Sequence, residues 1–221
     1  AWPSPRFSDN GDGTISDHLT GLEWLKDGNC IKTAYPTFDN DLFGGSGFGD
    51  GFVTWQSALE FVKGINDGTY PSCGAGNTDW RLPNVKELRS LVDYGRFGPA
   101  LPQGHPFTNI TGYWTSSTDV GGSNGELAWT IWIHSSGAVP GIGKSGAGWA
   151  VLPVRSGHPA GAPAPLPKTG QVACYDAWGV PIACAGTGQD GEYQEGVAWP
   201  NPRFTVGTGV EEACVIDHLT G

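Results

Sequence analysis

Asp79-Trp-Arg-Leu-Pro-Asn84 is followed directly by Val85-Lys-Glu-Leu-Arg-Ser-Leu-Val92, and this segment carries the most specific structural motif of the chain. Asn84 is a favoured helix N-cap residue, and Glu87 stands three positions later, where its carboxylate completes a capping box. Pro83 limits extension of the helix toward the N-terminus. The stretch therefore predicts an amphipathic helix whose buried stripe consists of Val85, Leu88, Leu91 and Val92.

On both sides of this helix, the pattern of apolar and polar residues predicts further helical and extended segments. A hairpin is predicted over Phe7–Trp24, with its turn at Asp9-Asn-Gly-Asp-Gly13. Another helix is predicted from about Thr54 to Val62, with Gly64 as its stop. Two early helices followed by antiparallel strands make an α+β fold. Three later strands are predicted at Tyr113–Ser117, at Ala128–Ile133 (apolar on both faces and so central) and at Trp149–Arg155, where Pro153 requires an edge or a bulge.

The sequence contains an internal repeat. Ala1-Trp-Pro-Ser-Pro-Arg-Phe7 recurs as Ala198-Trp-Pro-Asn-Pro-Arg-Phe204, and Asp17-His-Leu-Thr-Gly21 recurs unchanged as Asp217-His-Leu-Thr-Gly221. The two blocks keep their order, at offsets of 197 and 200 residues, so the later copy holds three additional residues between them. We therefore interpret residues 1–157 as one domain and residues 198–221 as the start of a second copy.

Two short segments separate these copies. Residues 158–170 are rich in Pro, Ala and Gly, a composition typical of a semi-rigid linker. Residues 171–197 form a cassette in which Cys174 and Cys184 flank a short turn-forming stretch. We expect this cassette to be a small β-hairpin closed by a disulfide.

The motifs follow one another in an order that resembles the Lcl C-terminal domain family, which occurs at the end of a bacterial collagen-like adhesin and in other secreted bacterial proteins. The resemblance covers residues 1–157 and implies a C-type-lectin-like fold at an extracellular or cell-surface location. It implies no catalytic residues. The motifs that carry it are Arg6-Phe7, Asp9–Thr14, Leu19-Thr-Gly-Leu-Glu-Trp24, Asp79–Asn84 with Glu87-Leu88, Tyr113-Trp-Thr-Ser-Ser117 and Val154-Arg155.

Composition excludes several classes of partner. The chain carries a net charge of −10, and its twelve Lys and Arg residues are scattered. This charge disfavours nucleic acids as ligands, and also the sulfated glycans associated with the adhesin after which the family is named. No apolar run reaches the length of a transmembrane helix, so no membrane insertion is expected of this segment. Ten tryptophans in a chain with 36 glycines and 17 prolines predict a loop-rich fold packed around large aromatic side chains.

Five cysteines without any C-x-x-C motif indicate disulfides in an oxidising compartment. Cys30 and Cys73 are the two cysteines of the first domain and are predicted to pair, the alternative being two free thiols. Cys174 is predicted to pair with Cys184. Cys214 is left over, and its partner is either a cysteine further along the protein or a cysteine of another subunit.

The Asp9–Asp17 stretch offers oxygen ligands for calcium from Asp9, Asn10, Asp12 and Asp17. Its spacing departs from the EF-hand pattern, and Asn-Gly and Asp-Gly turns explain the same residues without a metal. The acidic loop 39–50 is a second place where calcium is considered. No cofactor other than calcium is predicted.

Trp129 and Trp132 lie three residues apart on a predicted strand and should point to opposite faces. One of them is a candidate for stacking on a glycan or for contacting another subunit, while core packing explains most tryptophans of the chain. The five histidines show no spacing typical of a catalytic triad or a metal site, so no enzymatic activity is predicted.

These observations predict a non-catalytic extracellular module of a tandem-repeat bacterial protein, with a structural and adhesive role. Self-association into a surface fibre is expected through the cassette and the tail, where residues 198–221 add as strands to the sheet of a neighbouring unit. The alternative is a lectin-like module that binds a glycan with the assistance of calcium.

Overall fold

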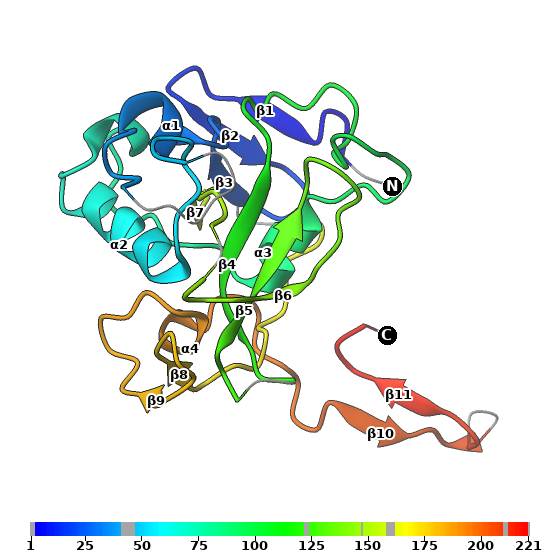
Figure 1. The fold of residues 1–221 in the computed structure, drawn as a ribbon. Coiled ribbons are helices and arrows are strands. Elements are labelled where there is room, and N and C mark those ends of the chain that lie inside the picture. The colour runs from blue at the N-terminus through cyan, green and yellow to red at the C-terminus, as the bar shows by residue number, and fades with distance from the viewer. Residues whose placement is uncertain are drawn as a thin grey trace.

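The computed structural model describes residues 3–40, 47–121, 124–146, 148–157, 162–209 and 212–220. Two small antiparallel sheets and three helices form a body, on which the cassette is packed (Figure 1). A two-stranded hairpin at the C-terminal end extends away from this body. This mixed fold, with few helices and antiparallel sheets, agrees with the α+β class expected from the sequence.

The first sheet has the strand order β1-β2-β3-β7 and is antiparallel throughout. The predicted hairpin forms its first two strands, with Phe7 opposite Asp17 in the register. The sheet brings the two ends of the body together, because Leu22 pairs with Ser156. The strands are β1 (Phe7–Asp9), β2 (Thr14–Asp17), β3 (Leu22–Leu25) and β7 (Val154–Ser156).

The second sheet has the order β4-β5-β6, formed by β4 (Gly112–Asp119), β5 (Leu127–Trp132) and β6 (Gly141–Gly143). The strand predicted to be central, β5, lies in the middle. The strand predicted at Trp149–Arg155 is wrong over most of its length, because only its end belongs to β7. Trp149 and Ala150 instead make isolated bridges to Val53 and Tyr113. Pro153 has no backbone N–H, so the ladder does not continue through it.

The two predicted helices are present, but one stop signal was misinterpreted. Helix α3 (Val85–Ser90) has the complete capping box between Asn84 and Glu87. Helix α2 (Trp55–Asn66) continues past Gly64. A Cβ at Gly64 would lie 2.4 Å from the ring of Tyr70, so this glycine permits close packing and does not end the helix. Three shorter elements were not predicted: α1 (Cys30–Ala34), the 3₁₀ helix η1 (Pro71–Cys73) and α4 (Asp190–Tyr193).

Three of the four fully buried tryptophans in the described part of the chain donate their indole N–H to a backbone oxygen, whereas that of Trp24 has no partner. Trp55 donates to the carbonyl of Thr115, and Trp114 donates to that of Val53, so each indole joins α2 or the segment before it to β4. Both tryptophans are fully buried. Trp55 and Trp114 therefore each contribute buried apolar area and one satisfied hydrogen bond between distant segments.

Candidate interface between units

The linker and the cassette lie against the body. Pro167 and Val197 form an isolated parallel bridge, through the bonds Lys168 N–H to Val197 O (3.0 Å) and Val197 N–H to Leu166 O (2.8 Å). The N–H of Ala164 also donates to the carbonyl of Leu19, in the loop before β3. The end of the linker and the end of the cassette therefore lie side by side against the body.

Between these ends, the cassette folds into the strands β8 (Cys174–Tyr175) and β9 (Pro181–Ile182) followed by α4. The two strands pair in antiparallel fashion. The side-chain amide of Gln189 donates to the carbonyl of Tyr175 and accepts from its N–H, both at 3.0 Å, and so takes the place of another strand beside β8.

Gln171 makes the same kind of contact between the cassette and the body. Its amide oxygen accepts from the N–H of Thr118 at 2.9 Å, and its amide nitrogen donates to the carbonyl of Thr118 at 3.0 Å. Thr118 lies where the register of β4 against β5 shifts. The glutamine thus satisfies backbone groups of an irregular strand.

Lys144 lies almost completely buried between the body and the cassette, with 1% of its surface exposed. Its Nζ donates to Thr118 Oγ1 at 3.0 Å and to the carbonyl of Asp176 at 3.3 Å, and it sits 4.1 Å from the ring centroid of Trp55. Burial lowers the pKa of Lys144 to about 8, and the nearby Asp176 carboxylate partly opposes this shift. The side chain links two segments through one desolvated cation.

A second polar contact under the cassette joins Asp190 to the body. Its carboxylate accepts from Ser117 Oγ at 2.5 Å, and the same Oγ accepts from the N–H of Val85 at 3.0 Å. Burial raises the pKa of Asp190, although its hydrogen bonds to Ser117 and Thr169 oppose the shift. The start of α3, the bulged part of β4 and α4 are thereby connected in one chain of hydrogen bonds.

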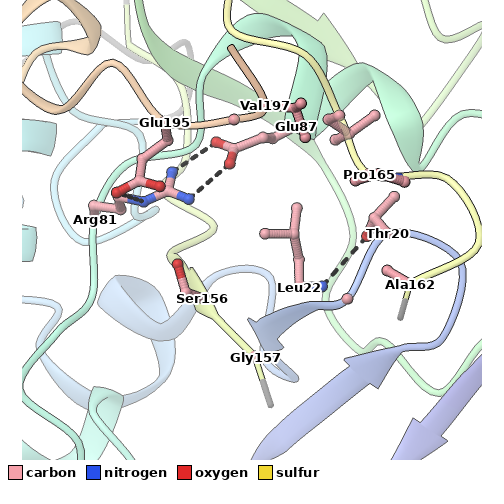
Figure 2. Close-up of a pocket in the computed structure, with 13 residues that line it drawn as sticks. Thr20, Leu22, Arg81, Glu87, Ser156, Gly157, Ala162, Pro165, Glu195 and Val197 are labelled. Atoms are coloured by element: carbon pink, nitrogen blue, oxygen red, sulfur yellow. Dashed lines mark hydrogen bonds and ion pairs between the residues drawn. The ribbon is translucent and has the colours of Figure 1, made fainter. Parts of the chain in front are cut away.

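A cavity of about 450 Å³ lies where the linker crosses the body (Figure 2). Arg81 lines it, but its guanidinium already donates two 2.6 Å hydrogen bonds to Glu87 and lies 3.9 Å from Glu195. Its charge is therefore neutralised within the protein, and it offers no unpaired cation to an anionic ligand. The remaining lining is mainly small and apolar: Thr20, Gly21, Leu22, Ser156, Gly157, Ala162, Pro165, Leu166, Gly196 and Val197.

Beyond the cassette, Trp199 contacts both the body and the tail. Its indole N–H donates to the carbonyl of Lys168 at 2.8 Å, and the same carbonyl accepts from Lys86 Nζ at 2.6 Å. Lys86 Nζ lies 5.2 Å and Arg203 Cζ 4.8 Å from the indole ring centroid, both within the range of cation–π attraction. Gly170 has a φ of +93°, and a Cβ there would lie 3.4 Å from the indole ring.

The tail repeats the first hairpin in structure. Strands β10 (Phe204–Val206) and β11 (Val215–Asp217) pair with Phe204 opposite Asp217, as Phe7 pairs with Asp17. The exposure of the two hairpins differs strongly. Phe204 and Val215 are 54% and 67% exposed, whereas their counterparts Phe7 and Ile15 are 9% and 0% exposed.

Both predicted disulfides are present in the structure. Cys30 and Cys73 are joined with a Cα–Cα distance of 5.9 Å, and Cys174 and Cys184 with a distance of 5.2 Å. Cys214 is exposed and carries a free thiol. By register it occupies the position of Thr14, because Gly207 N–H donates to Cys214 O as Asn10 N–H donates to Thr14 O.

The four residues considered as calcium ligands already form hydrogen bonds or ion pairs with other side chains of the protein. Asp9 accepts from Lys26 Nζ, Asp12 from Thr14, and Asn10 from Ser16. Asp17 is buried and paired with Arg6, so its carboxylate does not face the turn. Among the described residues, no group of three His, Cys, Asp or Glu side chains is placed to hold a metal. Of the second place considered, residues 41–46 lie outside the described parts of the chain.

Trp129 and Trp132 both lie on β5 and are half-buried. The ring of Trp132 stacks on that of Trp149, with 5.4 Å between the ring centroids. Trp132 is therefore partly committed to packing within the body. The roles of Lys144, Asp190 and Gln171 were not predicted, since each is an isolated polar residue outside any recognised motif.

These features define a mixed α/β domain with antiparallel sheets and disulfides, carrying a packed cassette and a repeated hairpin. Residues 13–155 match the Lcl C-terminal domain, and the chain belongs to that family. No curated protein and no solved structure matches the chain. In the described part of the chain, no helix has the length and apolar character needed to cross a membrane.

Proposed function

We propose that this chain is a non-catalytic structural and adhesive module of an extracellular, tandem-repeat bacterial protein. The body is a C-type-lectin-like domain, followed by the Pro-rich linker and the disulfide-closed cassette. Successive units assemble into a surface fibre through the cassette and the tail. In this proposal the linker and cassette set the spacing between units instead of acting as a free tether.

One observation carries this proposal: the tail hairpin copies β1–β2 in its register and in its Arg–Asp pair, so the same structural unit begins again along the chain. In the first copy, Phe7 and Ile15 are covered because β2 pairs with β3 and the sheet packs on the core. Phe204 and Val215 occupy the positions of Phe7 and Ile15 in the tail hairpin, whereas Val206 occupies the position of the exposed Asp9. An isolated two-stranded hairpin is marginal in water, so the tail hairpin is stabilised when further strands pair with it.

The packing of the cassette gives further support. Four independent polar contacts, made by Gln171, Lys144, Asp190 and Lys86, hold the linker and cassette against the body. A spacer fixed in this way transmits a defined orientation from one unit to the next, as a fibre with a regular repeat requires.

Negative-stain electron microscopy of the native secreted protein, without reductant, tests the proposal. Continuous fibres with a repeat that corresponds to one body plus cassette are the expected result. In a recombinant protein with several units, changing Phe204 and Val215 to Asp should disrupt the fibres, while Val180→Asp, on the exposed cassette turn, should leave them intact. Separate particles in the native material would contradict the fibre.

The second candidate is a glycan-binding lectin-like module assisted by calcium. A groove of about 460 Å³ between α2 and the cassette favours it, because Tyr193 is 43% exposed there beside Glu60 and Asn66. Such a mixture of one aromatic face and polar groups suits a sugar. Binding on a glycan array that Tyr193→Ala abolishes would support this function over the structural one.

A further inference from the structure

We infer that Trp199 forms a rigid joint between units, in which the Trp-Pro-x-Pro-Arg segment that opens one unit docks on the body of the unit before it. The docking surface consists of Lys86 on α3 together with Lys168 and Gly170 of the linker. The partner is thus the next copy of the same domain. This inference rests on the proposed function only in taking the units as consecutive.

The docking surface is preorganised for an indole. The Lys168 carbonyl accepts hydrogen bonds from both Lys86 Nζ and Trp199 Nε1, so the cation and the indole are set side by side by one backbone oxygen. Gly170 adopts a left-handed φ that favours glycine, which leaves its Cα face open to the indole. A larger residue at this position would have to shift the ring or strain the backbone.

Arg203 connects this tryptophan to the tail hairpin. Its guanidinium lies 4.8 Å from the Trp199 ring centroid and donates two hydrogen bonds to Asp217 on β11. The contacts therefore run without a break from α3 through Lys86, Trp199 and Arg203 to the second strand of the tail hairpin. The hairpin is attached to the body through side chains as well as through the backbone.

The first copy shows where this connection continues. Arg6, the counterpart of Arg203, donates to the carbonyl of Ser90 at the end of α3 in addition to its ion pair with Asp17. By the repeat, Arg203 reaches the corresponding carbonyl of the following unit. One joint thus links the start of α3 in one unit to the end of α3 in the next.

The joint is also directional. The segment with the tryptophan opens both copies in the sequence, and the docking surface lies in the body and linker that precede the second copy. Two different surfaces meet, so the contact is heterologous and repeats from unit to unit without closing on itself. This geometry sets the rotation between neighbouring units.

Backbone ¹⁵N relaxation of the 221-residue chain tests the joint. In the wild-type protein, β10 and β11 should show order parameters of about 0.85, like the body, and these should fall below about 0.6 in Trp199→Ala. Lys86→Met, which removes the cation but keeps the bulk of the side chain, should lower them partway. Trp178→Ala is the matched control, because Trp178 is 71% exposed on the cassette turn.

Independent motion of the tail in the wild type, or an unchanged tail in Trp199→Ala, would overturn the joint. An unchanged chemical shift pattern for the body confirms that each variant is folded. The outcome is separate from that of the fibre. If the tail is rigid but the protein forms only separate particles, the joint is supported and the fibre is not. If fibres form from units whose tails are mobile, the fibre is supported and the joint is not.

Discussion

Arg203 pairs with Asp217 across the tail hairpin through two hydrogen bonds, of 3.0 and 2.9 Å. The first hairpin contains the same pair, between Arg6 and Asp17, at the same two distances. The pair in the first copy is buried, whereas the side chains of the pair in the tail keep 27% and 21% of their surface exposed. One protein therefore contains the same ion pair in two dielectric environments.

The two pairs should differ greatly in their effect on stability. Arg6→Ala leaves Asp17 buried without its cation, and we expect a loss of about 3–5 kcal/mol in the free energy of unfolding. Arg203→Ala breaks the more exposed pair, for which the loss in the free energy of unfolding should be much smaller. Guanidinium unfolding followed by tryptophan fluorescence measures both. Equal losses would show that burial does not control the strength of this pair.

Removal of the disulfides should act on different parts of the molecule. The Cys30–Cys73 bond closes a separation of 43 residues, so replacing both cysteines by Ala should cost about 4 kcal/mol in the stability of the body. The Cys174–Cys184 bond closes a separation of only 10 residues and should cost about 3 kcal/mol, confined to the cassette. Thermal unfolding combined with hydrogen exchange separates the two effects. A cassette variant that unfolds the body equally would refute this assignment.

Lys144 should make stability depend on pH in the alkaline range. Its pKa is about 8 in the folded protein and 10.5 when unperturbed, so the unfolded chain binds more protons between these values. Stability relative to the Lys144→Met variant should therefore rise as the pH increases from 8 to 10.5, by up to about 3 kcal/mol. Urea unfolding of both proteins at several pH values provides the measurement. Parallel pH profiles for the two proteins would exclude a buried, perturbed lysine.

Asp190 should hold the cassette on the body. Asp190→Ala removes the acceptor of the Ser117 hydroxyl, and we expect the amides of β8 and α4 to exchange about ten-fold faster, since one buried hydrogen bond contributes roughly 1 kcal/mol. Hydrogen exchange with mass spectrometry resolves this segment. Asp67→Ala, an acidic residue that caps a turn after α2, is the control and should leave the cassette protected. Unchanged protection in Asp190→Ala would mean that the other contacts suffice.

Part of this protein was predictable because its signals are local. The capping box of α3 needs only Asn84 and Glu87, three positions apart, and it forms as predicted. The first hairpin likewise follows from its Asn-Gly and Asp-Gly turn. Gly64 was misinterpreted as a helix stop, because what requires a glycine there is the close approach of the Tyr70 ring, which packs against α2 from outside the helix.

The repeat, the helix caps, the turns and the pairs of cysteines were predictable from the amino-acid sequence, since each depends on residues whose identity or spacing is sufficient. Two features are known only from the tertiary structure: the cassette packs on the body, and Trp199 lies between Lys86 and Arg203. These contacts join isolated polar and aromatic side chains across up to 117 positions of sequence, from Lys86 to Arg203. No periodicity records such contacts, because they arise only when the folded body brings the backbone carbonyl of Lys168 next to both partners.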